Sequence, residues 1–216
     1  AARGLSSHKA AERAKWLPRR HTAQIGKLRA ILAVDVFGQP ADYDALRPIA
    51  DQYGLVLIED SCESLGALYK DRKAGRLGNY GVFAFYPNKQ ITTGEGGMIV
   101  TNRDEEATLM RALRNQGRAP GDTWLSHTHL GYNYRLSDIQ CALGTSQMER
   151  LDLFLARRKQ LAQWYGELLV GVPHVRPAPD HPGHAWHIYP LWVEPALRRQ
   201  GGQLLRRPLH CRGRPL

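Results

Sequence analysis

The pattern that most constrains the fold is a strand–helix–strand arrangement between residues 30 and 60. Residues 30–37 (AILAVDVF) form a short apolar run rich in Val and Ile, which predicts a buried strand. The next segment predicts a helix with Asp42 as its N-cap, short or bent because it contains Pro48. Residues 55–60 (LVLIED) predict a second strand that ends in two acids. Two strands joined by a helix within about thirty residues indicate a parallel unit and an α/β fold.

The same reading continues along the chain. Further elements of this domain are predicted to be two strands and a helix, at residues 80–87, 96–102 and 104–117. Ser137 can cap a helix over residues 138–169, whose apolar residues recur at helical spacing. A helix of that length commonly leaves one domain and enters another. Residues 184–193 predict a strand that opens the second part.

This organisation divides the chain into four expected segments. They are a basic N-terminal segment, part of a large α/β domain, a connecting helix with the start of a smaller C-terminal α+β domain, and an irregular basic tail: residues 1–29, 30–136, 137–194 and 195–216.

The positive charge of the chain is concentrated at its ends. The formal net charge is +10, but 8 of the 30 Lys and Arg residues lie in residues 1–29 and 6 lie in residues 195–216. Residues 30–194 contain 16 basic and 19 acidic residues, a net charge of −3. Nucleic-acid binders usually carry their basic residues on a folded face together with a recognisable motif. We therefore expect no nucleic-acid partner, and a basic-tailed nucleic-acid-binding protein is the weakest reading.

Several features argue against membrane, disulfide and metal chemistry. There is no apolar stretch of about 20 residues, and we expect a cytoplasmic protein without a membrane partner. The three cysteines form no Cys-x-x-Cys pair, so neither a disulfide framework nor a zinc site is expected, and Cys62 reads as a small buried residue. His181, His184 and His187 are spaced by three, but the run contains Pro182 and lacks a carboxylate, so we expect no metal site.

Two residues could carry chemistry together. Asp60 ends a predicted parallel strand, and ligands of open α/β sheets gather at that edge. Lys89 follows the next aromatic strand, in front of a glycine-rich turn (FYPNKQITTGEGG) in which Gly94, Gly96 and Gly97 would let the backbone pass closely behind the lysine. An aspartate and a lysine around an aromatic cofactor suit pyridoxal phosphate, whose aldehyde forms an imine with the amine. The plainer alternative is a solvated acid and a solvated lysine.

Three segments together resemble a known family. The stretches VLIEDSCESLGA, GVFAFYPNKQITTGEGGMIVT and GYNYRLSDIQCALG are similar to sugar aminotransferases of the DegT/DnrJ type, over about residues 30–194. The resemblance implies a three-layer α/β/α fold of the aspartate aminotransferase type with a mainly parallel sheet, and a homodimer. It also implies pyridoxal 5'-phosphate as cofactor, L-glutamate as amino donor and a nucleotide-linked keto-sugar as acceptor, in cell-surface polysaccharide or amino-sugar biosynthesis.

The resemblance also implies roles for individual residues. Lys89 matches the lysine that forms the imine with the cofactor and then acts as general base. Asp60 matches the partner of the pyridine nitrogen. Glu63 stands where many members have His or Gln near the cofactor. Asn133 matches an asparagine that reaches the cofactor phosphate of the neighbouring subunit.

The chain also departs from the family pattern. Ala84 stands where many members have a phosphate-binding Ser, and residues 1–29 show neither the glycine-rich phosphate turn nor the stacking aromatic residue. We therefore expect an incomplete enzyme. The leading alternative is a catalytically silent relative that acts only by pairing with other chains.

Overall fold

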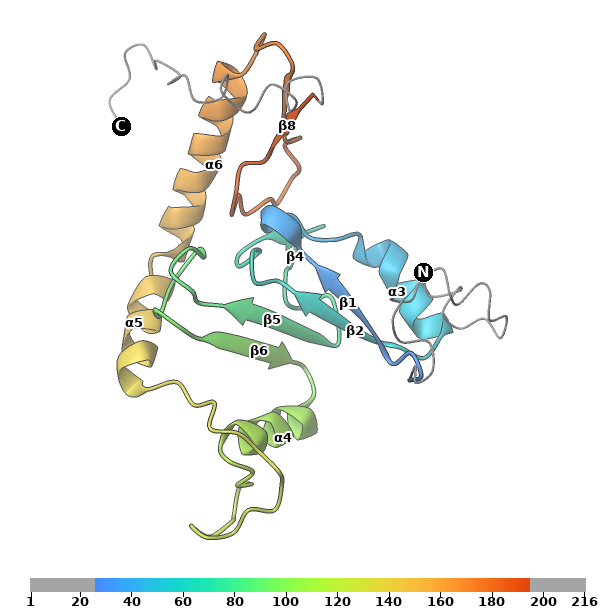
Figure 1. Ribbon diagram of the computed structural model, residues 1–216, viewed down its shortest axis with the longest axis vertical. Coiled ribbons are helices and arrows are strands. Elements are labelled where there is room, and N and C mark those ends of the chain that lie inside the picture. Colours follow the sequence, from blue (N-terminus) through green and yellow to red (C-terminus); the bar gives the residue numbers. More distant parts are fainter. Residues whose placement is uncertain (1–25, 195–216) are drawn as a thin grey trace.

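The computed structural model describes residues 26–194, and its centre is a four-stranded sheet in the order β1-β2-β5-β6 (Figure 1). The strands are β1 (Ala30–Val34), β2 (Val56–Asp60), β5 (Tyr80–Ala84) and β6 (Gly97–Thr101). The first three are mutually parallel, and β6 pairs with β5 in the antiparallel direction. The expected α/β fold with a mainly parallel sheet is therefore confirmed.

The helix between β1 and β2 is α3 (Tyr43–Gln52), and it packs against β2. Its N-terminus is capped as expected, because the side chain of Asp42 accepts a hydrogen bond from Ala45 N at 3.2 Å. Pro48 lies inside the helix without ending it. The core of this unit is formed by buried apolar residues from the two strands, the helix and the loop before β5: Ala33, Tyr43, Ala50, Leu55, Leu57 and Leu77.

One short hairpin, one further helix and a 3-10 turn complete the sheet region. The short hairpin between β2 and β5 consists of β3 (Leu68–Tyr69) and β4 (Arg72–Lys73), and α4 (Asp104–Arg114) packs against β6. A single 3-10 turn, η1 (Val36–Gly38), follows β1 directly.

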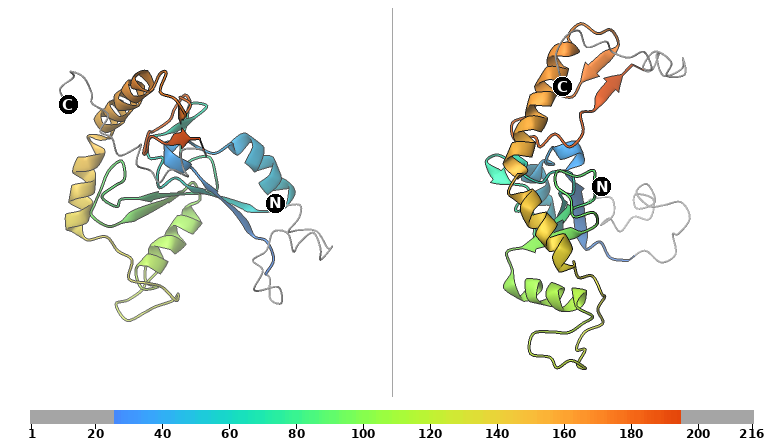
Figure 2. Two further views of the ribbon diagram at one scale, coloured as in Figure 1. Left: turned by 45° about the horizontal axis from the view of Figure 1, so that its top comes forward. Right: turned by 90° about the vertical axis from the view of Figure 1, so that its left-hand side faces the viewer.

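The long helix expected over residues 138–169 is divided in two. Helix α5 (Asp138–Met148) and helix α6 (Leu151–Leu168) are separated at Glu149 and Arg150. Figure 1 shows them following one another along one side of the molecule, and Figure 2 shows the bend between them. Helical spacing of apolar residues continues through such a break, so the pattern could not reveal it.

The strand expected over residues 184–193 is much shorter. Only β8 (Leu191–Val193) forms, and it pairs with β7 (Val175–Pro177) beside α6. Residues 184–190 instead form a loop whose backbone N–H groups bond to η1: Ala185 N donates to Gly38 O at 2.8 Å, and His187 N donates to Phe37 O at 2.9 Å. The apolar residues of this loop therefore pack against the sheet region without joining a sheet.

The limits of the four expected segments stay predictions, since most of both basic ends lies outside residues 26–194. Within those residues, none of the helices combines the length and the apolar character that crossing a membrane requires.

Candidate functional site

The end of β2 places Asp60 at the edge where the parallel strands finish. In the sheet it lies in register between Val34 of β1 and Val82 of β5. Because strand side chains alternate, Asp60 and Glu59 point to opposite faces, and Glu59 is fully buried whereas Asp60 is half-buried. Oδ1 of Asp60 accepts a hydrogen bond from Cys62 N at 3.2 Å. The expectation that Asp60 ends a parallel strand is therefore confirmed.

Lys89 lies in the turn between β5 and β6. Its backbone N donates to Tyr86 O at 2.9 Å, and Thr93 N donates to Phe85 O at 2.9 Å, so the turn closes on itself. The side chain of Lys89 is only 15% exposed, and its Nζ lies 3.6 Å from Oε1 of Glu63. The amine is thus held beside a carboxylate at the same edge of the sheet as Asp60.

Glu63, in the loop after β2, is held by two other segments. Its Oε2 accepts a hydrogen bond from Phe37 N at 2.7 Å. Its backbone carbonyl accepts a hydrogen bond from Nε2 of Gln90. Because Gln90 directly follows Lys89, this bond ties the lysine turn to the loop that carries the carboxylate.

The thiol of Cys62 lies within range of the charges of both Asp60 and Lys89. Burial raises the pKa of Cys62 to about 12, the nearby Asp60 carboxylate adds to the increase, and the positive charge of Lys89 opposes it. A thiol with so high a pKa is neutral at physiological pH and is a poor nucleophile. The side chain of Cys62 is half-buried, so its sequence-based interpretation as a small buried residue is only partly met.

His187 is a member of the site that sequence reasoning missed. Its side chain is 3% exposed, and its Nε2 lies 3.7 Å from Oε1 of Glu63. The three-residue spacing of His181, His184 and His187 led us to consider these residues only as metal ligands. It did not predict a contact between His187 and Glu63. A local signal could not have found it, because 124 positions separate it from Glu63.

The approach of His187 depends on a glycine. Gly38 has φ +102°, and a Cβ at this position would lie 2.8 Å from Trp186 N and 2.9 Å from His187 N. A side chain would thus collide with the backbone of the loop that carries the histidine, in a conformation that L-residues rarely adopt. The loop can dock on η1 only because residue 38 is a glycine.

The glycine-rich turn behind Lys89 has a different role from the one expected. A Cβ at Gly96 (φ +149°) would lie 2.7 Å from Oγ1 of Thr93 and 2.8 Å from Cδ2 of Leu136. A Cβ at Gly94 (φ +79°) would meet nothing within 4 Å, so there the backbone conformation alone favours glycine. The expected clearance for the lysine is therefore wrong in detail, since the tight contacts involve Thr93 and Leu136.

Asn133 is not brought to Lys89 within this chain. It is exposed and forms an isolated bridge with Asn115, at the C-terminal end of α4. Figure 1 shows this end of α4 and the segment that follows it beyond β6, away from α6. A role for Asn133 at the site of a second subunit stays a prediction.

The residues present fit the ring and the aldehyde of pyridoxal phosphate better than its phosphate. Asp60 offers a carboxylate with one oxygen, Oδ2, that accepts no hydrogen bond from residues 26–194, and Lys89 offers a primary amine. The hydroxyls of Ser61 and Ser64 donate instead to Asp35, at 2.7 and 2.8 Å. They are therefore engaged in the structure of the loop, which leaves the phosphate end to other groups.

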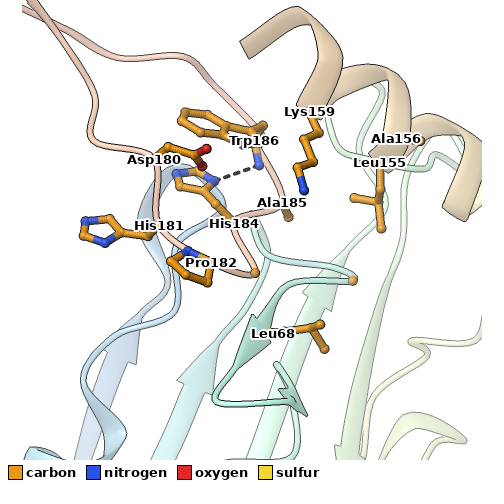
Figure 3. A pocket seen from close by; sticks show the side chains of 12 residues that line it. Leu68, Leu155, Ala156, Lys159, Asp180, His181, Pro182, His184, Ala185 and Trp186 are labelled. Atoms are coloured by element: carbon orange, nitrogen blue, oxygen red, sulfur yellow. Dashed lines mark hydrogen bonds between the residues drawn. The ribbon is translucent and has the colours of Figure 1, made fainter. Parts of the chain in front are cut away.

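Lys89, Glu63 and His187 form a cluster of charged and polar side chains. A cavity of about 530 Å³ lies next to this cluster, between α6 and the loop of residues 180–186 (Figure 3). Figure 3 shows Lys159 and Leu155 on the helix side and Pro182 on the loop side. Nδ1 of His184 accepts a hydrogen bond from Trp186 N at 2.8 Å, and burial lowers the pKa of His184 to about 4. Neither Lys89 nor Glu63 lines the cavity, so it is a neighbour of the cluster and not part of it.

Comparison with a family model supports the resemblance seen in the sequence. Residues 17–207 match the model of the DegT/DnrJ/EryC1/StrS aminotransferase family. Among curated proteins, the chain is 43% identical over 155 residues to GDP-perosamine synthase of Caulobacter vibrioides, a match that covers 69% of this chain and 42% of the relative.

Solved structures give the same result. Helicobacter pylori PseC, an aminotransferase involved in the biosynthesis of pseudoaminic acid, superposes with a TM-score of 0.77 at 27% identity, covering 91% of this chain and 52% of PseC. The E. coli GDP-4-keto-6-deoxy-D-mannose-3-dehydratase with bound hydrated PLP superposes with a TM-score of 0.72 at 25% identity, covering 82% of this chain and 51% of the enzyme. The chain spans about half the length of these relatives.

Proposed function

Because the chain belongs to the DegT/DnrJ/EryC1/StrS aminotransferase family, we propose that it is part of a pyridoxal-phosphate-dependent sugar aminotransferase. The reaction would transfer an amino group from L-glutamate to a nucleotide-linked keto-sugar. The names of its relatives, which include a GDP-perosamine synthase and an aminotransferase of pseudoaminic acid biosynthesis, support this class of acceptor. The product would then serve amino-sugar or cell-surface polysaccharide biosynthesis in the cytoplasm.

One arrangement carries the proposal: Asp60 ends β2 at the carboxyl edge of the parallel strands, and Lys89, in the turn after β5, lies with its Nζ 3.6 Å from Glu63 in the loop after β2. When bound, pyridoxal phosphate supplies an aldehyde that condenses with amines and a ring that accepts electrons when a bond at the substrate Cα breaks. The primary amine of Lys89 would anchor the cofactor covalently. The same Nζ would then accept a proton from the substrate Cα and return it, as a general base.

The other residues hold and orient. The carboxylate of Asp60 would stabilise a proton on the ring nitrogen, because an anion beside a protonated base favours its charged form. Glu63, 3.6 Å from Lys89 Nζ, would keep the amine directed toward the ligand.

The phosphate end and the oligomeric state belong together in this proposal. Asn133 would reach the cofactor phosphate of a neighbouring subunit, compensating in part for Ala84. A homodimer is supported by apolar side chains that α5 leaves at the surface, among them Ile139, which is 83% exposed. Tyr132 and Tyr134, stacked with ring centroids 4.9 Å apart, extend this surface before the helix.

The test is to incubate the purified chain with pyridoxal phosphate, reduce it with borohydride and map the modified peptide. We expect one adduct on Lys89, its absence in Lys89→Ala, and about a tenfold lower yield in Asp60→Ala, since one pKa unit of lost pairing corresponds to a tenfold change. Lys73→Ala, which removes an exposed lysine, is the matched control.

The second candidate function is a catalytically silent chain that acts only by pairing with other chains. It is favoured by Ala84, which stands where many members of the family have a phosphate-binding Ser. Labelling scattered over several lysines, or none at all, would support this reading and overturn the enzyme proposal.

A further inference from the structure

The side chain of Glu63 contacts two basic side chains, those of Lys89 and His187. Its Oε1 lies between two nitrogens, 3.6 Å from Nζ of Lys89 and 3.7 Å from Nε2 of His187. Its Oε2 is fixed separately by Phe37 N at 2.7 Å. The carboxylate thus has one oxygen anchored to backbone and one shared between a lysine and a histidine.

His187 is built into this position from both sides of its backbone. Its N donates to Phe37 O at 2.9 Å, and its carbonyl accepts from Nη1 of Arg158 at 3.0 Å. Phe37, a non-glycine residue with φ +61°, contacts both partners, since its N–H faces Glu63 and its carbonyl faces His187. Conformations of this kind cost free energy and persist where the surrounding structure holds them, often at functional sites.

The two ring nitrogens of His187 have different surroundings. Nδ1 of His187 is buried and has no hydrogen-bond partner among residues 26–194, whereas Nε2 faces Glu63. A buried polar atom without a partner is costly, so the position is not explained by hydrogen bonding of the imidazole to the core. The ring is held with its Nε2 toward the carboxylate of Glu63, 3.7 Å away.

Burial is the main reason that the ring of His187 favours its neutral form. Burial lowers the pKa of His187, Glu63 acts in the opposite direction, and Lys89 and Arg158 lower it further. The charged groups that face His187 are Glu63 from the loop after β2, Lys89 from the turn after β5 and Arg158 from α6. A neutral imidazole carries one N–H, and the carboxylate that Nε2 faces is that of Glu63, 3.7 Å away.

We propose that His187 is a positioning residue that acts on Lys89 through Glu63: its Nε2–H orients the carboxylate, and the carboxylate orients the amine. This inference rests on the proposed function in one respect, because Lys89 is the amine expected to hold the cofactor. The contacts among His187, Glu63 and Lys89 do not depend on that function, and they can be tested without cofactor.

The experiment measures how fast a neutral acylating reagent modifies Lys89 in the full chain, relative to the exposed Lys73 in the same sample. Glu63→Gln should raise this ratio about three- to tenfold, because an amine released from its ion pair with Glu63 is freer to react. His187→Asn should raise it in the same direction, by less. The double variant Glu63→Gln/His187→Asn should match Glu63→Gln alone, since a residue that acts through another adds nothing once the intermediary is gone.

A conservative pair separates positioning from packing. In His187→Gln the amide nitrogen can occupy the place of Nε2, so the wild-type ratio should be retained, whereas the shorter Asn amide mimics Nδ1 and should not restore it. Circular dichroism melting checks that both variants fold. Should His187→Asn fail to fold, the comparison of His187→Gln with wild type and Glu63→Gln decides alone.

The outcomes are distinct. Additive effects in the double variant, or equal effects of His187→Gln and His187→Asn, would overturn the inference and leave His187 a packing residue. Loss of the pyridoxal phosphate adduct with the expected acylation pattern intact would overturn the proposed function and leave the positioning network in place.

Discussion

Helices α3 and α5 satisfy the same local rules and have opposite fates. They contain 10 and 11 residues, and each begins at a side-chain cap, Asp42 for α3 and Ser137 for α5. Helix α3 buries Tyr43 and Ala50 against the sheet, whereas α5 buries no residue within the described part of the chain. Capping therefore determines where a helix begins, and only the surface available to it determines whether it joins a core.

The difference extends to the polar groups nearby. Around α3 and the strands it joins, buried carboxylates find partners inside the chain: Glu59 and Asp35 both accept several hydrogen bonds. Around α5, apolar side chains such as Ile139 and Met148 face outward instead. One region is complete within these residues, and the other presents a surface that a partner would bury.

The largest effect on the free energy of unfolding should come from Glu59, in the region around α3 and the sheet. Its carboxylate accepts hydrogen bonds from Gly75 N at 2.6 Å, from Leu77 N at 2.5 Å and from Gly78 N. Glu59→Ala should lower the free energy of unfolding by about 3–5 kcal/mol, because buried donors lose their acceptor. Urea denaturation followed by circular dichroism measures this.

Glu59→Gln is the matched control, since its amide oxygen can still accept, and we expect it to cost about half as much. Equal costs for Ala and Gln would show that the carboxylate is held by charge and not by these backbone bonds.

A smaller effect is expected at Tyr43, on the helix of the same region. Its hydroxyl is buried and donates to Oδ1 of Asp35 at 2.8 Å. Tyr43→Phe should lower the free energy of unfolding by about 1–2 kcal/mol, because Asp35 loses one of its donors while the ring still packs. Tyr53→Phe, which removes a hydroxyl without a hydrogen bond to residues 26–194, should change it little; a similar cost for both would contradict the assignment.

The complete region is also the one that sequence reasoning described best. The parallel strands and the cap at Asp42 follow from patterns of a few residues, and the structure contains them. Such patterns report local geometry, which a chain can display without its tertiary contacts.

The remaining features of the site depend on contacts between distant segments. His187 reaches Glu63 through a loop that docks on Gly38, and the break at Glu149 and Arg150 interrupts an unbroken apolar period. A sequence pattern records which residues are apolar, but not which distant backbone they approach. For this reason the places of Lys89 and Asp60 in the fold could be predicted from sequence, whereas the contact of His187 with Glu63 could not.

The loop that carries His187 gives a pH-dependent prediction. Burial lowers the pKa of His184 from 6.5 to about 4. The folded chain thus keeps this histidine neutral while the unfolded chain takes up a proton below about pH 6.5. The contribution to stability is full above pH 6.5 and is lost as the pH falls toward 4, by about 1 kcal/mol after allowance for partial exposure.

Thermal melts at pH 7 and pH 4.5 test this against His184→Asn, whose amide oxygen can still accept from Trp186 N. The variant should lose less stability than wild type between the two pH values. His127→Gln, in the exposed segment after α4, should behave as wild type; if it matched His184→Asn, the pH dependence would have another source.

The smallest effect on stability should come from the outward face of α5. Ile139 is 83% exposed, so Ile139→Lys should change the free energy of unfolding by less than about 0.5 kcal/mol. If the face joins two copies, the same change should abolish self-association in sedimentation-velocity runs, because a charge buried in an apolar interface is costly. Gln163→Lys, which adds the same charge at an exposed position of α6, should leave association unchanged. If the Ile139→Lys chain still self-associates, the exposed apolar face of α5 is not the surface that joins two copies, and the contrast between α3 and α5 has another cause.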